Sequence, residues 1–412
     1  MREVKRVSKV NIYPDSEYFE SLLSFCHLSK NLYNRVAYIE RHCIFNKTKL
    51  LGNYEISKQL QNDLEYPDYK NMPTAQSAQQ TIKQAVGDFK NYLKSLKEYN
   101  KDKKKFKNKP RLPHYKEKEG YYPLTFTNQN CKIKNGFLNF PASCNGMKFK
   151  TDVDKKENYV KLSEVKITPT PNKIVILITY TIKVYDVKKT KSKHILGIDL
   201  GINNLASCVD NFGKVSFLID GRYLKSVNQE CNKNIANYKS VLEKTYKKKT
   251  SKFLTSLYLN RYHRVEDYLH KASREIVNRC LENKIDTIVV GYNKGWKEND
   301  VTSKKFNQNF NHIPFRRFLD LLKYKCEDAR IKYIETNESY TSGTSFVDHE
   351  KPTKKFYDKS RRIKRGLFKT NNGILINADI NGAYQIINKK FQCDYKKGFV
   401  TSGERVFVLN NN

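Results

Sequence analysis

The sequence HILGIDLGINNLASCVDNFGKVSFLID, residues 194–220, decides the fold class of this chain. Its three apolar runs are separated by two turns rich in glycine and asparagine, which predicts three consecutive short strands. Downstream, strand-like and helix-like runs alternate, at residues 286–293, 314–330, 331–337 and 378–390. A meander followed by alternating strands and helices predicts a mixed sheet with helices on its faces.

Towards the N-terminus the pattern of apolar residues changes twice. An alternating segment closed by Pro14 predicts one strand, and apolar residues at helical spacing from Ser16 predict a helical block. A succession of strand-like runs then extends to about Asp186. The expected divisions are a first strand in 1–15, helices in 16–118, a β-rich unit in 119–190 and a mixed α/β unit in 191–412. The predicted fold class is therefore α+β with several domains.

The charge of the chain indicates a polyanionic partner. Of 412 residues, 78 are Lys or Arg and 42 are Asp or Glu, which gives a formal charge of +36. Such self-repulsion in a folded chain favours binding to nucleic acid. Aromatic residues make up 12% of the chain, a share that a disordered basic tail would not have.

Two basic segments are candidates for phosphate contact. Residues 101–118 combine a lysine run with Pro110 and Pro113, which exclude a continuous helix and favour an extended loop. A solvated charge run would explain this loop, but its interleaved aromatic residues favour contact with a nucleic-acid backbone. The second segment lies in a basic helical hairpin expected over 225–283, where lysines cluster at the turn.

Other classes of protein fit the sequence poorly. No run approaches the roughly twenty apolar residues that a membrane span needs, and the N-terminus lacks an apolar signal core, so we expect neither insertion nor secretion. The nine cysteines include no C-x-x-C pair, so neither a disulfide framework nor a zinc ribbon is expected. We expect the chain to work in the cytoplasm on the nucleoid of a prokaryote, or in the nucleus if it is eukaryotic or viral.

Two aspartates stand in apolar surroundings of the α/β unit. Asp199 ends an apolar strand between two glycines, where an unpaired carboxylate costs several kcal/mol. Asp379 precedes an apolar helical run. Each has an ordinary explanation, Asp199 as a turn residue and Asp379 as a helix N-cap. Together they are what a site for divalent metal and phosphodiester needs.

A third carboxylate would complete a site for two metal ions. The strand at 286–293 carries Gly291 where an acidic residue could be expected, and the next strand ends near Glu335 and Glu338. Glu335 lies within the strand, whereas Glu338 follows it in the loop, where active sites collect. We therefore prefer Glu338 to Glu335.

Three motifs carry a family resemblance. GIDLGINNLA at 197–206, ESYTSGTSF at 338–346 and NADINGA at 377–383 resemble the RuvC-type motifs of the TnpB (OrfB) proteins of insertion sequences. These proteins are related to Fanzor proteins and to type V CRISPR effectors. Upstream, PTAQSAQQ at 73–80 and LTFTNQN at 124–130 resemble the TnpB recognition region.

The resemblance implies an RNA-guided DNA endonuclease of a transposable element. Such a protein binds a guide RNA from the transposon end, with one or two proteins per RNA. It reads a short motif beside double-stranded target DNA and cuts with two Mg²⁺ ions, for which Mn²⁺ can substitute. The implied layout is a RuvC (RNase H-like) nuclease domain, a β-barrel wedge domain and a helical recognition domain inserted into the wedge.

The resemblance also assigns residues. Catalysis and metal binding fall to Asp199, Glu338 and Asp379. Nucleic-acid contact is assigned to Gln76, Gln80, Lys103, Lys104, Lys105, Lys107, Lys109, Arg111, Tyr115, Lys247, Lys248, Lys249, Arg361, Arg362, Lys364 and Arg365.

The chain departs from the family pattern at two places. The usual second-motif glutamate is replaced by Gly291, but some branches, Fanzor proteins among them, place a glutamate three residues before the Thr of the T-S motif, as Glu338 precedes Thr341 here. The competing interpretation is that the site is catalytically inactive. In the insertion at about 341–373, the expected zinc cysteines are replaced by Ser345, Asp348, Lys369 and Asn372, so we expect no zinc.

Three other functions were weighed against this one. An inactive RNA-guided repressor would keep the charge but lose carboxylates, and a structural RNA-binding protein would need no acidic residues in apolar strands; both Asp199 and Asp379 remain. A protein-only transposase of the RNase H-like type would not need the basic helical block, which better fits an RNA-binding effector.

Overall fold

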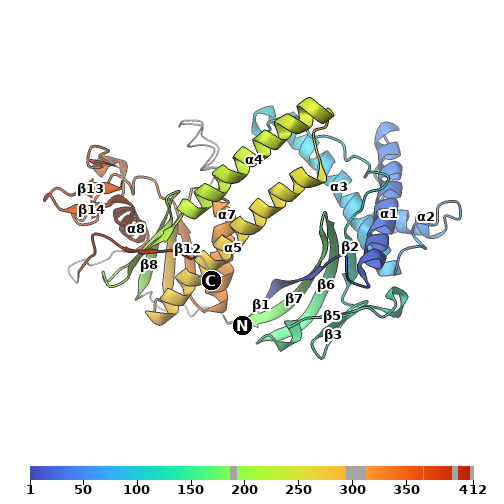
Figure 1. The fold of residues 1–412 in the computed structure, drawn as a ribbon, viewed down its shortest axis with the longest axis horizontal. Helices are drawn as coiled ribbons and strands as arrows, with labels where there is room; N and C mark the ends of the chain where they lie inside the picture. The colour runs from blue at the N-terminus through green and yellow to red at the C-terminus, as the bar shows by residue number, and fades with distance from the viewer. Residues whose placement is uncertain (186–192, 294–311, 365, 392–397, 409–412) are drawn as a thin grey trace. The chain divides into compact units, whose positions relative to one another are not determined.

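The computed structural model describes residues 1–185, 193–293, 312–364, 366–391 and 398–408. The chain forms two compact units, Met1–Val184 and Tyr185–Asn412 (Figure 1). The expected boundary between 190 and 191 and the side chain of Arg365 lie outside the described residues.

The first unit is built on a four-stranded sheet of order β1-β7-β6-β2. The strands are β1 (Arg2–Ile12), β7 (Lys173–Val184), β6 (Tyr159–Thr170) and β2 (Leu124–Thr127). All neighbours are antiparallel, and β1 pairs with β7 along its full length, from Arg2 opposite Val184 to Ile12 opposite Ile174. A smaller sheet joins β3 (Lys132–Lys134), β4 (Phe137–Asn139) and β5 (Lys148–Lys150).

Helices pack on this sheet to form the core of the first unit. They are α1 (Phe19–Phe45), α2 (Asn53–Gln61) and α3 (Ala75–Lys101). The Thr74 side chain caps α3 by accepting a hydrogen bond of 3.1 Å from the Ser77 N–H. The apolar faces of all three helices share one buried cluster with the sheet. The short helix α2 was not expected from the sequence.

The second unit contains a mixed six-stranded sheet of order β12-β11-β8-β9-β10-β15. The strands are β8 (Ile195–Leu200), β9 (Asn204–Asp210), β10 (Ser216–Asp220), β11 (Thr287–Gly291), β12 (Lys332–Thr336) and β15 (Glu404–Val406). The first three form the antiparallel meander that the sequence predicts, whereas β11 joins β8, β12 joins β11 and β15 joins β10 in parallel.

Helices cover both faces of this sheet, as expected for a mixed α/β fold. They are α4 (Arg222–Tyr246), α5 (Lys252–Glu282), α7 (Phe315–Asp328) and α8 (Ala378–Asn388). In β11, Ile288 and Val290 belong to the cluster formed with α4, α5 and α7, whereas Val289 faces the cluster formed with α8. This alternation is the two-residue period of a strand buried on both faces. Figure 1 shows α4 and α5 running antiparallel to each other.

The segment between β12 and α8 is mostly irregular. It contains a short 3₁₀ turn at Lys354–Phe356 and the two-stranded sheet of β13 (Leu367–Lys369) and β14 (Leu375–Asn377). None of the helices in the described part of the chain is long and apolar enough to cross a membrane.

Candidate active site and nucleic-acid-binding surfaces

Asp199 lies near the end of β8, where that strand packs closely on α8. A Cβ on Gly382 of α8 would lie 2.8 Å from the Oδ2 atom of Asp199, and a Cβ on Gly197 would lie 2.3 Å from the backbone oxygen of Ala383. Side chains at these two glycines would force the helix away from the strand. The glycines of both motifs therefore bring the carboxylate of Asp199 against the start of α8.

The electrostatics of Asp199 are those of an uncompensated carboxylate. Burial raises its pKa well above the usual value, and the neighbouring charges of Asp379 and Glu338 raise it further. The guanidinium of Arg362 and a backbone hydrogen bond oppose these effects only in part. The carboxylates that the sequence predicted as one site thus lie close enough to repel each other.

Asp379 is the second residue of α8, but its side chain does not cap the helix. The N-cap is Asn377, whose side chain accepts hydrogen bonds from the N–H groups of Asp379 and Ile380 at 2.9 and 3.2 Å. The carboxylate of Asp379 instead accepts a hydrogen bond of 2.8 Å from the Asn204 amide and lies 3.6 Å from Arg362. The simple N-cap explanation of Asp379 is therefore wrong.

Glu338 approaches Asp199 from the loop after β12. A Cβ on Gly291 would lie 3.2 Å from the Cβ of Glu338 and 2.6 Å from the Cδ1 atom of Ile386. The side chain of Glu338 therefore begins where a side chain at position 291 would begin, and Gly291 leaves room for it. Asn293 holds the loop through two hydrogen bonds, to the carboxylate at 3.3 Å and from the backbone N–H at 3.2 Å. Burial raises the pKa of Glu338 to about 7.

Glu335 takes part in a different set of contacts. It forms an ion pair of 2.9 Å with Arg316 of α7 and accepts a hydrogen bond of 3.2 Å from the hydroxyl of Tyr333. Its charge is already balanced there, whereas the charge of Glu338 is not. The geometry thus favours Glu338 over Glu335 as the third carboxylate.

The chemistry of this acidic cluster fits a hard divalent cation. Carboxylate oxygens are the ligands that Mg²⁺ prefers, and raised pKa values indicate a lack of positive charge that a cation would supply. Within the described ranges, however, no three Asp, Glu, His or Cys side chains are close enough together to hold an ion as they stand. Ion binding would therefore require the carboxylates to move closer together.

Asn204 and Arg405 support Asp379, although neither was identified from the sequence as a site residue. Arg405 of β15 donates one hydrogen bond of 3.2 Å to the Oδ1 atom of Asn204 and another of 2.8 Å to buried Asp220. Because Asn204 accepts from Arg405 through its oxygen, its amide nitrogen faces Asp379. Asn204 lies within the first motif and could have been suspected, whereas nothing in the sequence around Arg405 indicates this contact.

Arg361 and Arg362 have different environments, although the sequence predicted nucleic-acid contact for both. The side chain of Arg362 is 41% exposed beside Asp379, whereas that of Arg361 is 10% exposed and pairs with Asp348 and Glu350. The environment of Arg361 does not favour the predicted contact, because its guanidinium is paired inside the insertion. Lys364 is exposed, as predicted for a binding residue.

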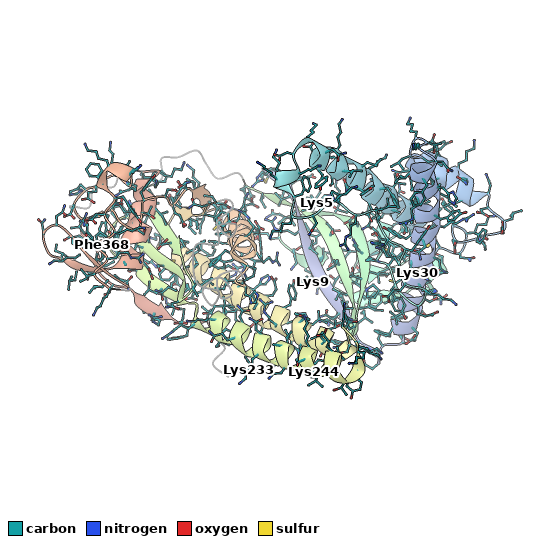
Figure 2. The ribbon with its side chains drawn as sticks, turned by 90° about the horizontal axis from the view of Figure 1, so that it is seen from above. Lys5, Lys9, Lys30, Lys233, Lys244 and Phe368 are labelled. Atoms are coloured by element: carbon teal, nitrogen blue, oxygen red, sulfur yellow. The ribbon has the colours of Figure 1, made fainter. Side chains whose placement is uncertain are left out.

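The predicted basic surfaces are exposed to solvent. The residues concerned are Lys103, Lys104, Lys105, Lys107, Lys109, Arg111, Tyr115, Lys247, Lys248 and Lys249. Tyr115 receives the guanidinium of Arg41 over its ring at 5.0 Å. Farther along α4, Lys233 and Lys244 extend the basic surface of the hairpin (Figure 2).

The two predicted glutamines at the start of α3 are only half-exposed. Gln76 accepts a hydrogen bond of 3.1 Å from the Asn130 amide, which joins the motifs at 73–80 and 124–130. The hydroxyl of Thr74 donates to the amide oxygen of Asn130 at 3.4 Å. The structure therefore gives Gln76 a role in joining α3 to the loop after β2, and Gln80 shows no such contact.

Comparisons with known proteins agree with the motifs. Residues 175–297 match the OrfB_IS605 family, described as a probable transposase, and residues 315–386 match the Cas12f1-like TNB domain. These two segments are TnpB-like. The resemblance predicted from the three RuvC-type motifs is thereby confirmed, and the second match covers Glu338 and Asp379.

One solved structure shows a similar fold. A Cas12f1 protein in complex with sgRNA and target DNA is similar with a TM-score of 0.57 and 16% identity, covering 90% of this chain and 84% of that chain. The mini-RNA-guided endonuclease CRISPR-Cas_phi3 gives a TM-score of 0.48 and 10% identity, covering 97% and 94%. No curated protein matches the sequence significantly. At these identities the likeness to Cas12f1 concerns the fold alone.

Proposed function

We propose that this TnpB-like chain is an RNA-guided endonuclease that cuts double-stranded DNA beside a short target-adjacent motif. The observation that carries the proposal is the meeting of Asp199, Glu338 and Asp379, carboxylates from distant segments, of which Asp379 and Glu338 add to the effect of burial in raising the pKa of Asp199. A fold has no structural use for such mutual repulsion, whereas a metal-dependent nuclease does.

The carboxylates would hold two Mg²⁺ ions, which polarise the scissile phosphate and activate a water when bound. Asp199 and Asp379 face each other across the β8–α8 contact, and Glu338 completes the cluster from the loop after β12. Asn204 orients the carboxylate of Asp379 through its 2.8 Å hydrogen bond. This hydrogen bond would hold the carboxylate of Asp379 before substrate arrives.

Among the described residues, Arg362 is a cation that lies beside the acidic cluster and could meet the DNA there. Its guanidinium lies 3.6 Å from Asp379 and is 41% exposed, so it can turn from the carboxylate to an incoming phosphate. We assign to it the binding of the scissile strand next to the acidic cluster. The other exposed lysines and arginines would hold guide RNA and heteroduplex through backbone contacts, while base pairing reads the sequence.

The domain roles follow from the same proposal. The sheet of the first unit with β1 would act as the wedge domain, and α1 to α3 as the recognition domain that binds RNA and duplex DNA. The second unit, from Tyr185, would supply the nuclease domain. Measuring which segments are protected by bound guide RNA in hydrogen exchange would test this division.

A second function, a guide-directed repressor that binds DNA without cutting it, has one observation in its favour. The carboxylates in the described part of the chain do not form a group that could hold an ion without rearrangement. Such a protein would retain the charge and the fold but bind no metal at Asp199.

One experiment distinguishes the two functions. The chain is purified with its co-expressed guide RNA and incubated with matched target DNA in Mg²⁺. We expect guide-dependent cleavage that EDTA abolishes. Tight, guide-dependent binding of the target without any cleavage would refute the nuclease and support the repressor.

A further inference from the structure

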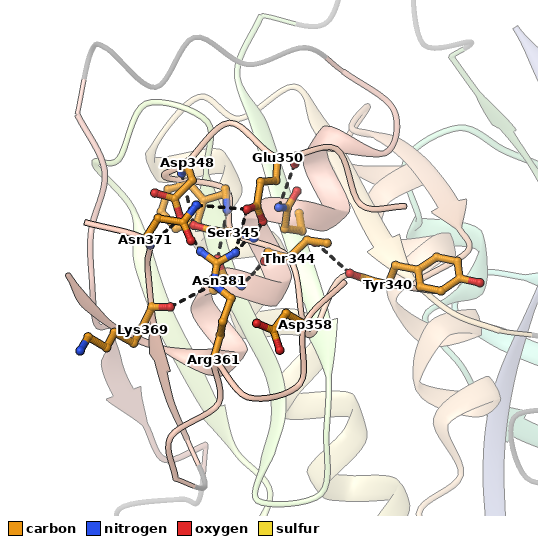
Figure 3. A network of polar contacts seen from close by, with 12 residues as sticks. Tyr340, Thr344, Ser345, Asp348, Glu350, Asp358, Arg361, Lys369, Asn371 and Asn381 are labelled. Carbon is orange, nitrogen blue, oxygen red and sulfur yellow. Dashed lines mark hydrogen bonds and ion pairs between the residues drawn. The ribbon is translucent and has the colours of Figure 1, made fainter. Parts of the chain in front are cut away.

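Arg361 is the centre of a polar network inside the insertion (Figure 3). Its Nη1 atom donates to both carboxylate oxygens of Glu350 at 2.8 Å, its Nη2 atom donates to Asp348, and its Nε atom donates to the backbone oxygen of Lys369 at 3.2 Å. The side chains of Arg361, Asp348 and Glu350 are only 10%, 7% and 12% exposed. We call these three residues the arginine clasp.

The clasp closes the insertion on itself. The Asn371 N–H donates to Asp348 at 3.0 Å, and the Ser345 N–H donates to Glu350 at 2.7 Å. Burial tends to raise the pKa of Asp348, but hydrogen bonds from Asn371 and Ser345 and the charge of Arg361 lower it overall. Segments before and after the 3₁₀ turn are thereby held by one planar cation that donates from all three of its nitrogen atoms.

The clasp is also attached to the helix that carries Asp379. The Gln385 amide donates to the backbone oxygen of Glu350 at 3.1 Å, and the Asn381 amide donates to that of Thr344 at 2.8 Å. Phe346 stacks on Tyr384 with ring centroids 4.0 Å apart. Insertion and α8 therefore meet in a buried, hydrogen-bonded contact.

This arrangement fixes the position of Arg362. The backbone of Arg361 accepts a hydrogen bond of 2.9 Å from the Lys369 N–H while its side chain is held by the clasp. The next residue then projects its guanidinium to Asp379. We propose that Arg361 is a positioning residue whose clasp replaces a structural zinc ion in this insertion and holds Arg362 at the acidic cluster, an inference that rests on the proposed nuclease function.

Three of the four residues that stand at the positions of the family's zinc cysteines belong to this network. Ser345 and Asp348 belong to the network, and Lys369 accepts from Arg361. A carboxylate already paired with a guanidinium, a hydroxyl and an ammonium do not form a zinc site, because structural zinc is bound by thiolates and imidazoles. The clasp performs the cross-linking that a tetrahedral metal would perform.

The test compares four variants of the guide complex: Arg361→Met, Arg361→Lys, Arg362→Ala and the double variant Arg361→Met with Arg362→Ala. Exposed Lys359 on the same segment supplies the control Lys359→Met. Single-turnover cleavage and target binding are measured separately. Since misplacement by 1 Å can cost about 10²-fold, we expect Arg361→Met to slow cleavage about 10- to 100-fold with binding within about twofold.

The double variant separates positioning from general damage. If Arg361 acts through Arg362, the double variant will cleave no more slowly than Arg362→Ala. Arg361→Lys will recover part of the rate, since it keeps the positive charge but loses the planar set of donors of the guanidinium. If the rate loss of the double variant equals the product of the losses of the two single variants, the proposal is overturned. A loss of target binding equal to the loss of cleavage would overturn it too, because Arg361 would then contact nucleic acid.

Hydrogen exchange of the purified complex gives a readout that does not depend on cleavage. We expect Arg361→Met to accelerate exchange in residues 343–371 and not in α4 and α5, and a zinc-selective chelator to leave wild-type exchange unchanged. Acceleration by the chelator would show a metal in place of the clasp. If the wild-type protein never cuts but this exchange pattern holds, the nuclease proposal fails and the clasp remains.

Discussion

Two acidic clusters of the second unit differ in how their charge is balanced. Asp348 and Glu350 face a guanidinium supplied by the chain itself, and the pKa of Asp348 is lowered. Asp199 is compensated only in part by Arg362, and Glu338 accepts a hydrogen bond from the neutral amide of Asn293; the pKa values of both carboxylates are raised. Carboxylates that the chain neutralises hold the structure, whereas carboxylates that it leaves uncompensated are available to an external cation.

Removing a carboxylate of the uncompensated cluster should have the largest effect. We expect Asp199→Asn and Asp379→Asn each to reduce guided cleavage by about 10³-fold or more, since the metal ligands would be incomplete. Co-purified RNA and target binding should stay unchanged. Cleavage within tenfold of wild type would show that the carboxylates do not hold the catalytic metal.

The third carboxylate is tested by a matched pair. Glu338→Ala should slow cleavage about 10²-fold or more. Glu335→Ala, which breaks an ion pair with Arg316 and a hydrogen bond from Tyr333, should change it by less than about threefold. Both are measured as single-turnover rates on the same target. A larger loss of cleavage in Glu335→Ala than in Glu338→Ala would assign the third carboxylate to Glu335.

Neutralising one carboxylate should change the free energy of unfolding in opposite directions in the two clusters. Glu350→Gln leaves a buried guanidinium partly unpaired and should lower the free energy of unfolding by about 3 kcal/mol. Glu338→Gln removes a charge disfavoured by burial. Because the folded pKa is raised above the unfolded value, that cost is absent below about pH 4.5 and complete above pH 7.

For Glu338→Gln we therefore expect a gain of about 1–3 kcal/mol at pH 8, which disappears towards pH 4.5. Denaturant unfolding of the apoprotein in EDTA at both pH values measures it. A loss of stability at pH 8 would show that the ionised carboxylate already has a partner.

The same pKa predicts the pH dependence of cleavage. Glu338 must be ionised to bind metal, so at low Mg²⁺ the rate should fall about tenfold per pH unit below pH 7. Raising Mg²⁺ should move this inflection to lower pH, since the cation competes with the proton. A rate that does not change between pH 6 and 8 in limiting Mg²⁺ would contradict a raised pKa at this site.

The smallest effect concerns the support of Asp379 by Arg405. Arg405→Met frees the Asn204 amide to turn, so we expect a three- to fivefold rise in the Mg²⁺ concentration needed for half-maximal cleavage, with less change in the maximal rate. Arg222→Met, which removes the other cation of Asp220, is the control. Equal effects would indicate that only Asp220 matters.

Parts of the fold were predictable because their signals are local. The meander from Ile195 to Asp220, the strands β11 and β12 and the helix α8 follow from apolar periodicity and turn residues, and the structure has them within a few residues of the expected bounds. The helix α2 is too short to show periodicity, and β15 depends on pairing with β10, which is distant in sequence.

The candidate site divides in the same way. Asp199, Glu338 and Asp379 could be named from residue type and motif, and the choice of Glu338 followed from its loop. The contacts of Arg361 could not be predicted, because nothing in the local sequence distinguishes it from Arg362. The guanidinium of Arg361 turns into the insertion, and that of Arg362 turns to Asp379.

The sequence by itself determined the basic character of the chain, the order of its strands and helices and the residues able to bind a hard cation. These properties depend on composition and on neighbours along the chain. The tertiary structure alone decided which charges are balanced, since that depends on groups such as Arg405 and Glu350 brought in from distant segments. Burial and these neighbouring groups then set the pKa of each carboxylate. They decide whether it pairs with Arg361 in the arginine clasp or is available to a cation in the candidate site.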